Sequence, residues 1–259
     1  MGELFTTLFI NPTFNILLVF MYVFSTWGIP GSLGWAIIAL TALFRMASNP
    51  FYKKQAHMAV QMELLRPEIE KLQKQYKEEP KKLQEEQMKL YKDNNINPAA
   101  SCVGAIIQLP VILALYQVLL KFFQTDILKI SAMLNKIAYA DFLKNLPIDP
   151  HFLGFNLSVA PSLYAQNGYQ YLAIPLVTAF LQYLQVVKTQ PKKSATKPED
   201  KDSFQAVFQK QMKVMFPIMI GYFSYILPVG LALYWNVFSI ISILQTPKKM
   251  DEALPVKGK

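Results

Sequence analysis

A single arginine inside an apolar stretch has the clearest chemical consequence in this sequence. Arg45 lies in the run LTALFRMASNPF, about one turn before the polar residues begin. A guanidinium inside a bilayer costs roughly 2.5–3.5 kcal/mol on insertion scales, so it is usually paired or faces water. The alternative is that its long side chain reaches the headgroups. Thr41 and Ser48 share its helical face, at spacings of four and three. The pattern predicts a polar stripe on an apolar helix.

Similar polar positions occur in other apolar stretches. Amides and hydroxyls in hydrocarbon need partners or water. The alternative use of such groups is hydrogen bonding between helices, which is common and modest in strength. Because several stretches carry them and one also carries an arginine, we expect a shared hydrated cavity that opens toward the cytosol. Its candidate residues, besides Arg45 and Thr41, are Gln108, Thr178, Gln182, Gln185, Trp235, Asn236 and Ser239, with Ser242 on the same stripe as Ser239.

Conventional catalysis finds little support in the residues. The histidines, His57 and His151, lie outside the apolar stretches, and these stretches contain no Asp or Glu. The sequence shows no metal-ligand cluster, no Ser/His pairing and no phosphate-binding Gly-rich loop. We therefore predict a protein that is not an enzyme and needs no metal, nucleotide or other cofactor.

The elements that must position these residues are membrane helices. The chain has 259 residues, of which 53% are hydrophobic and 17% charged. Soluble domains are nearer a quarter charged, and apolar blocks approaching bilayer length are typical of transmembrane helices. The net charge of +9 also suits nucleic-acid binding. The lysines flank the apolar blocks, however, which is the pattern that sets membrane orientation, so no specific DNA is expected. The single Cys102 excludes an intrachain disulfide framework.

We predict an all-α, multi-pass membrane protein with a five-helix transmembrane core. The first span covers residues 32–49, and a cytoplasmic helical hairpin follows over 50–98. The second span is 99–123, an extracytoplasmic segment covers 124–167, and the third span is 168–187. A cytoplasmic loop over 188–211 leads to the fourth span at 212–227, the fifth at 228–246 and a short cytoplasmic tail at 247–259.

The N-terminal residues 1–31 contain no Lys or Arg, which indicates the outer side of the membrane. They also lack the basic region and cleavage site of a signal peptide. The apolar piece over 15–27 is either an interfacial helix or a further span. Most of the lysines lie in residues 50–98, 188–211 and the tail, which are therefore expected in the cytoplasm. Lys129, Lys136 and Lys144 lie in the segment predicted to be on the outer side of the membrane. The charges therefore predict an N-out, C-in topology.

Prolines and heptad spacing divide the polar and C-terminal regions. Pro67 either interrupts a helix or starts one at its first turn, and Glu79-Pro80 marks a turn. The last apolar run is too long for one span, and Pro228-Val-Gly230 breaks it into a hairpin of two short helices. The apolar seam of the hairpin consists of Met58, Met62, Leu65, Ile69, Leu72 and Tyr76. Most charges around it are expected to be a solvated face.

The order of these parts resembles the YidC/Oxa/Alb membrane insertase family. The stretches that carry the resemblance are LTALFRMASNPFYKKQ, ELLRPEIEKLQKQY, LYKDNNINPAASCVGAIIQLPVILALY, FLGFNLSVAPSLY and FPIMIGYFSYILPVGLALYWNVFSIISILQ, which extend over most of residues 32–246. An arginine near the end of the first span, a charged hairpin, an NP before a Q-x-P span and a final G-L-x-L-Y-W together form a specific combination.

The resemblance implies a hydrophilic groove, open to cytosol and lipid but closed to the outside, in a bacterial inner-membrane protein. Arg45 matches the groove arginine of the family, and Gln108 and Tyr234 match positions that line the groove or meet the substrate. The hairpin matches a mobile cytoplasmic element. The N-terminal stretch matches an amphipathic helix on the outer surface. The implied function is insertion of nascent membrane proteins without nucleotide hydrolysis.

Several departures and alternatives accompany the resemblance. The family often has Gly-Cys-Leu-Pro where this chain has Ser101-Cys102-Val103-Gly104, and Ser239 replaces an Asn. No large extracytoplasmic domain is expected, and the short tail implies only weak ribosome contact. Membrane lipids and the Sec translocon are the other implied partners, with independence from Sec left open. The alternative functions are a passive assembly scaffold and a small-solute transporter, although no internal repeat supports the transporter.

Overall fold

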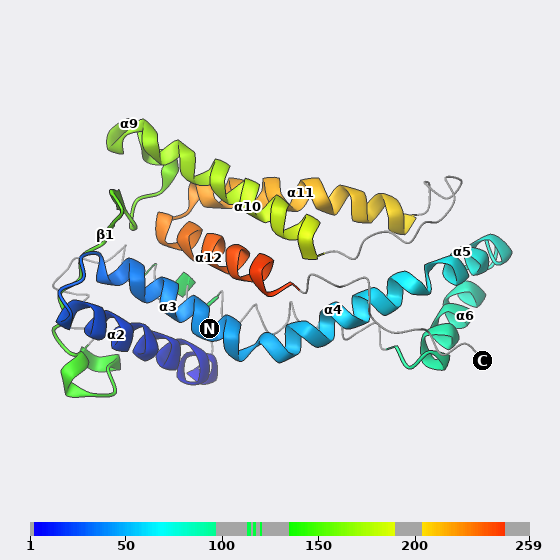
Figure 1. Cartoon of the computed structure of the whole chain (residues 1–259), viewed down its shortest axis with the longest axis horizontal. Helices are drawn as coiled ribbons and strands as arrows, with labels where there is room; N and C mark the ends of the chain where they lie inside the picture. Colours follow the sequence, from blue (N-terminus) through cyan, green and yellow to red (C-terminus); the bar gives the residue numbers. More distant parts are fainter. Residues whose placement is uncertain are drawn as a thin grey trace.

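The N-terminal part of the chain is one long apolar helix that folds back along the next. The computed structural model describes residues 3–96, 135–189 and 204–246, with residues 113, 114, 116, 117 and 120 between them. α1 (Glu3–Phe5), the π-helical η1 (Thr6–Ile10) and α2 (Asn11–Thr26) follow one another without a break. Gly28 and Gly31, with φ of 68° and 72°, turn the chain into α3 (Ser32–Ala47). α2 and α3 lie side by side in Figure 1.

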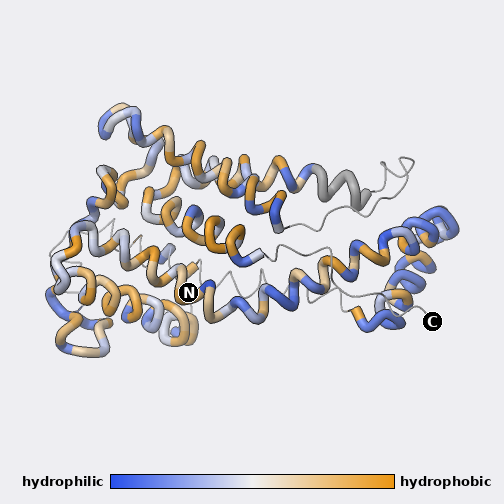
Figure 2. The backbone as a smooth tube through the Cα atoms, viewed as in Figure 1, coloured by the Kyte–Doolittle hydropathy of each residue, from blue (hydrophilic) through white to orange (hydrophobic). Residues whose placement is uncertain are grey.

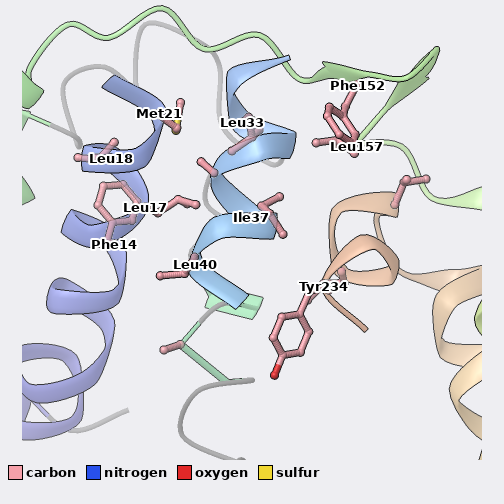
Figure 3. Close-up of a cluster of buried hydrophobic side chains, with 14 of the residues drawn as sticks. Phe14, Leu17, Leu18, Met21, Leu33, Ile37, Leu40, Phe152, Leu157 and Tyr234 are labelled. Carbon is pink, nitrogen blue, oxygen red and sulfur yellow. The ribbon is translucent and has the colours of Figure 1, made fainter. Parts of the chain in front are cut away.

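Apolar side chains fill the contact between α2 and α3. Phe14, Leu17, Leu18 and Met21 are buried, as are Leu33, Ile37 and Leu40 (Figure 3). The outward face of the N-terminal helix is also apolar, since Leu4, Leu8, Phe9 and Val19 are exposed. Glu3–Thr26 and Tyr169–Thr189 are the two described helices that are long and apolar enough to cross a membrane, whereas Ser32–Ala47 and Val229–Gln245 are apolar but shorter. Residues 15–26 belong to the helix Glu3–Thr26. Its length and hydropathy are sufficient for a membrane span, which was one of the two alternatives for residues 15–27.

A polar arm extends from the end of α3. α4 (Asn49–Leu64) continues the direction of α3 after a one-residue break at Ser48, α5 (Arg66–Gln75) follows, and α6 (Pro80–Asp93) folds back on α5 (Figure 1). Figure 2 shows the arm as mainly hydrophilic beside the apolar helices. Pro67 lies in the first turn of α5, which agrees with the second of its two alternatives. Pro80, predicted to mark a turn, is the first residue of α6.

The predicted seam of the arm forms only in part. Leu65, Ile69 and Ile96 are buried together, with Met58, Met62, Leu90 and Tyr91 packed against them. Leu72 and Tyr76 of the predicted seam are not in this cluster. The hairpin itself consists of α5 and α6, because α4 runs on from α3 rather than pairing with α6.

The segment before the third predicted span contains short irregular elements. These are η2 (Asp141–Leu143), β1 (His151–Phe152), β2 (Phe155–Asn156), η3 (Pro161–Leu163), α9 (Tyr164–Asn167) and η4 (Tyr169–Leu172). β1 and β2 form an antiparallel ladder that pairs His151 with Asn156 and Phe152 with Phe155. The prediction of an all-α chain is wrong at this ladder. The buried Asn15 side chain fixes the segment to α2, because it donates to Ile137 O and accepts from Tyr139 N.

Three helices complete the described chain: α10 (Ala173–Thr189), α11 (Phe204–Ile226) and α12 (Val229–Gln245). α12 packs against both α3 and α10, and α10 packs against α11. Gly221 permits close approach of α10 and α11, since a Cβ there would lie 2.9 Å from the Cβ of Ala179. The chain breaks between α11 and α12 at Pro228, within the segment Pro228-Val-Gly230 where the sequence predicted a break.

The start of α11 differs from the prediction. The helix begins at Phe204 rather than at residue 212, so the end of the predicted loop 188–211 is helical. The prediction failed because it took the start of the apolar run as the start of the helix, whereas polar residues such as Gln and Lys continue a helix readily. Most of the predicted second span, with Gln108, and the tail 247–259 lie outside the described residues.

Candidate functional site

α3, α10 and α12 run in the same direction from one shared segment, residues 151–159. Phe152 contacts the first turns of α3, where its ring packs edge-on against Trp35 at 5.4 Å. The first two N–H groups of α12, on Val229 and Gly230, donate to the carbonyls of Val159 and Leu157. The Tyr171 hydroxyl, just before α10, accepts from Asn156 N at 2.8 Å. The later residues of all three helices therefore lie at the opposite end of the molecule.

The shared segment closes its end with apolar packing. Phe152 and Leu157 are buried between α3 and α12, as Figure 3 shows. Gly34 provides the space for Phe152, because a Cβ at residue 34 would fall 2.2 Å from the Phe152 Cγ. Leu33, Val229 and Leu231 complete this layer of buried apolar side chains. The end of the bundle against the shared segment is therefore dry and tightly packed.

Arg45 lies at the other end of α3 and is buried. It is thirteen residues after Ser32, about 20 Å along the helix. The residue is only 7% exposed, and its Nε and Nη1 atoms have no hydrogen-bond partner among the described residues. Its Cζ lies over the ring of Tyr52 in α4 at 3.7 Å and over the ring of Phe238 in α12 at 4.8 Å. Arg45 is thus enclosed by aromatic rings, which argues against the alternative of a side chain extended to the headgroups.

Gln182 and Ser239 join α10 to α12 beside this arginine. The Ser239 hydroxyl donates to Gln182 Oε1 at 2.8 Å, and both residues are buried. Arg45 of α3 contacts Phe238 of α12. The next residue of α12, Ser239, bonds to Gln182 of α10. The structure therefore brings together Arg45, Gln182 and Ser239 from three separate helices.

The two predicted threonines are engaged within their own helices. The Thr41 hydroxyl donates to Ile37 O at 2.6 Å, and the Thr178 hydroxyl donates to Ile174 O at 2.9 Å. Both side chains are buried. These bonds satisfy the hydroxyl donors in an apolar setting, and each oxygen keeps the capacity to accept a further bond.

Several buried polar atoms of α10 and α12 have no partner in the part of the chain that is described. They are Gln185 Oε1, Asn236 Oδ1 and Gln245 Oε1, in addition to the two arginine nitrogens. An unsatisfied buried polar group costs about 1–3 kcal/mol, so such groups normally hold water or a ligand. Their occurrence on α3, α10 and α12, the three helices that carry the predicted polar stripes, favours hydration along these helices.

Tyr234 and Trp235 lie between the dry end and the polar level. Tyr234 is buried in the apolar cluster, and Figure 3 shows its hydroxyl pointing away from Phe152 and Leu157. Its ring lies 6.1 Å from that of Phe238. Trp235 is half-buried and packs against the same cluster. Of the predicted site residues, Gln108 lies outside the described residues.

Tyr52 and Phe238 are site residues that the sequence reasoning missed. Tyr52 is seven residues after Arg45, which is two turns along a helix and places both on one face if α3 continues into α4. That spacing was the available signal.

Comparisons with known proteins identify the family of the chain. A family model described as "60Kd inner membrane protein" matches residues 22–251. The chain is 34% identical over 226 residues to ALBINO3-like protein 1, chloroplastic, of Arabidopsis thaliana, covering 85% of this chain and 44% of that protein. It is 33% identical over 226 residues to the membrane protein insertase YidC of Alkalihalophilus pseudofirmus, covering 83% and 72%. For the YidC of Cupriavidus necator the identity is 30% over 219 residues, covering 84% and 32%.

A solved structure shares the fold. It is described as "Active YidC insertase crystal structure with the first transmembrane domain resolved", and it matches with a TM-score of 0.56 and 22% identity over 96% of this chain and 47% of that chain. The chain therefore spans less than half the length of this structure and of the chloroplast relative. Because the family model matches most of its residues, the chain belongs to the YidC/Oxa/Alb family of inner membrane proteins.

Proposed function

We propose that this protein inserts nascent membrane proteins into a bilayer through a hydrophilic groove, without nucleotide hydrolysis. The observation that carries the proposal is the buried Arg45, which has no carboxylate partner among the described residues. α10 and α12 of the same bundle carry buried amide oxygens that also have no partner among those residues. Family membership and the name insertase, borne by the YidC relatives, support it. The groove is lined by Arg45, Gln182, Gln185, Asn236 and Ser239, with Gln108 as the expected contribution of the second span.

The groove lowers the free-energy barrier for a polar segment to cross. A carboxylate moved into hydrocarbon loses its hydration, and this loss dominates the cost of crossing. Arg45 attracts the carboxylate, and the amides replace part of its water. The remaining barrier is the dry layer around Phe152 and Leu157, which is thinner than a full bilayer. The apolar segment of the substrate then leaves along α10 and α12 into lipid, driven by burial of its surface.

The proposed topology places residues 151–159 outside and the arm in the cytosol of a bacterium. The five spans of the core are α3, the second span over 99–123, α10, the apolar part of α11, and α12. The helix Glu3–Thr26 lies on the outer surface in the arrangement implied by the family resemblance, and it forms a further span in the alternative. The proposed partners are nascent membrane proteins and lipids, with weak ribosome contact through the tail and a Sec translocon as an optional companion.

Reconstitution of the purified protein in liposomes tests the proposal. The substrate is a short single-span protein with an acidic N-terminal tail, and insertion is scored by protection of the tail from protease without ATP. We expect Arg45→Ala to lower insertion of this substrate about tenfold, since a charge-assisted hydrogen bond contributes roughly 1.5–3 kcal/mol. The same substrate with Asn in place of Asp is the matched control, and its insertion should change little. Lys144→Ala removes a positive charge far from the site and should leave both rates unchanged.

The outcomes separate the alternatives. Equal insertion of acidic and neutral tails by Arg45→Ala would remove the arginine from the mechanism and keep the insertase function. If folded wild-type protein inserted nothing above empty liposomes, the passive scaffold would replace the insertase as the preferred function.

A further inference from the structure

The two arginines of this chain have opposite surroundings. Its 26 basic residues include only two arginines, Arg45 and Arg66. Arg66, in the cytoplasmic arm, donates to Glu70 at 2.9 Å and to Glu63 at 3.1 Å. Burial lowers the pKa of Arg66, but the two carboxylates more than offset this and raise it. Among the described residues, Arg45 has aromatic rings where Arg66 has carboxylates, so in this part of the chain the charge of Arg66 is neutralised and that of Arg45 is not.

The rings around Arg45 come from two different elements. Tyr52 belongs to the first turn of α4 and Phe238 to the second half of α12. Their own centroids lie 6.3 Å apart, with ring planes at 70°. The guanidinium carbon lies over both rings, at 3.7 Å from Tyr52 and 4.8 Å from Phe238. Arg45 is therefore held between the arm and the bundle.

A ring face stabilises a guanidinium differently from a carboxylate. A carboxylate accepts the N–H groups and cancels the charge. A ring face attracts the cation through its quadrupole and does not require the N–H donors. Consistent with this, Nε and Nη1 of Arg45 are buried without a hydrogen-bond partner among the described residues. The donors are available to an incoming acceptor, and the charge is already held in place.

We propose that Tyr52 and Phe238 are positioning residues that hold the Arg45 guanidinium by their ring faces and so keep its Nε–H and Nη1–H donors free for a carboxylate of the inserting segment. This inference rests on the proposed function. It adds that selectivity for acidic segments depends on the aromatic character of residues 52 and 238, in addition to the charge at residue 45.

A structural measurement tests the positioning by itself. Protein with ¹⁵N-labelled arginine in lipid nanodiscs gives two Nε–H signals, and Arg45→Lys assigns them. Protons over an aromatic face are shifted upfield by the ring current, so the Arg45 signal should lie upfield of the Arg66 signal. We expect Tyr52→Leu to move the Arg45 signal back and Tyr52→Phe to leave it shifted. An unshifted Arg45 signal in the wild type, or no movement in Tyr52→Leu, would overturn the inference.

The functional measurement compares insertion of the acidic and the neutral tail. Tyr52→Leu should lower the ratio of the two rates roughly tenfold, because desolvated cation–π contacts are strong, and Tyr52→Phe should keep it. Phe238→Leu should have a smaller effect in the same direction, since its ring is farther from Cζ. Tyr139→Leu is the matched control, because this tyrosine is 65% exposed and lies far from the arginine in the predicted outer segment.

The two proposals fail in different ways. If Arg45→Ala lowers the ratio and Tyr52→Leu does not, the positioning role is wrong and the insertase mechanism stands. If Arg45→Ala leaves the ratio unchanged while the Nε–H signals behave as expected, the rings hold the arginine but the proposed use of its charge is wrong.

Discussion

Ser239 and Gln182 form the direct polar link between α10 and α12 at the level of the site. Interhelical hydrogen bonds in membrane proteins contribute about 0.6 kcal/mol on average and at most about 1.7 kcal/mol. We predict a coupling free energy in this range for the double-mutant cycle of Ser239→Ala and Gln182→Leu. Unfolding by SDS titration from mixed micelles measures it, with the wild type, both single variants and the double variant.

Ser242 provides the matched control for this cycle. Its hydroxyl donates to Phe238 O within α12, so it should show no coupling to Gln182→Leu. Equal coupling for Ser242 and Ser239 would mean that the cycle reports general loosening of α12 rather than the bond to Gln182.

At the residue level, the sequence singled out side chains that are conspicuous by their type. Arg45, Gln182 and Ser239 stand out because polar groups are rare in apolar helices, and all three are buried. Their role in a groove stays a prediction. Tyr52 and Phe238 could not be singled out in this way. An aromatic ring over a guanidinium has the same composition as a ring in an ordinary core, and only the three-dimensional contact distinguishes the two.

At the scale of elements, the seal between α3 and the β1–β2 hairpin depends on a missing side chain. A Cβ on Gly34 would overlap the ring of Phe152. We predict that Gly34→Ala destabilises the protein by about 1–3 kcal/mol through overpacking, although Ala favours helix more than Gly does. The SDS unfolding midpoint and hydrogen exchange of residues 151–157 measure the effect.

A second variant distinguishes overlap from other causes. Phe152→Ala removes the ring that Gly34→Ala would strike, so the double variant should lose less stability than the sum of the two single variants. Strict additivity, or a more stable Gly34→Ala protein, would contradict the overlap.

Proline made the element boundaries predictable, and its absence made them uncertain. Pro67 is the second residue of α5, Pro80 is the first residue of α6, and Pro228 directly precedes α12. Proline favours these positions because it fixes φ and lacks a backbone donor. The β1–β2 ladder was missed because two-residue strands are too short to show an alternating pattern. The early start of α11 was missed because a polar helical turn and a polar loop have similar compositions.

At the scale of the whole molecule, the arm and the β1–β2 hairpin lie at opposite ends of the helices. The proposed topology therefore predicts opposite labelling of two single cysteines in a Cys102→Ser background. Glu79→Cys, at the turn between α5 and α6, should react with a membrane-impermeant maleimide only from the cytoplasmic side. Asp149→Cys, just before β1, should react from outside in intact cells. Labelling of both from one side would exclude the proposed orientation.

The sequence predicted the apolar blocks of the molecule better than their arrangement. Hydrophobic length and lysine flanks identify candidate spans, because bilayer thickness and charge bias act on composition. The packing order, in which α12 lies between α3 and α10, depends on side-chain shape at each contact. Gly221 against Ala179 is one such contact, and neither residue is unusual in the sequence.

The one-residue break at Ser48 is the point about which α4 could pivot, and Tyr52 lies much closer to it than the far end of α4 does. Tyr52 is four residues from this fulcrum, about 6 Å, and Leu64 is sixteen residues away, about 24 Å. If α4 turned about Ser48 as a rigid rod, the Tyr52 ring would move only about a quarter as far as Leu64 at the far end of the helix. By the same ratio, a load on that end would be multiplied about fourfold where the ring meets the guanidinium. If α4 moves in this way, a weak push over a long distance at Leu64 would become a short, strong displacement beside Arg45.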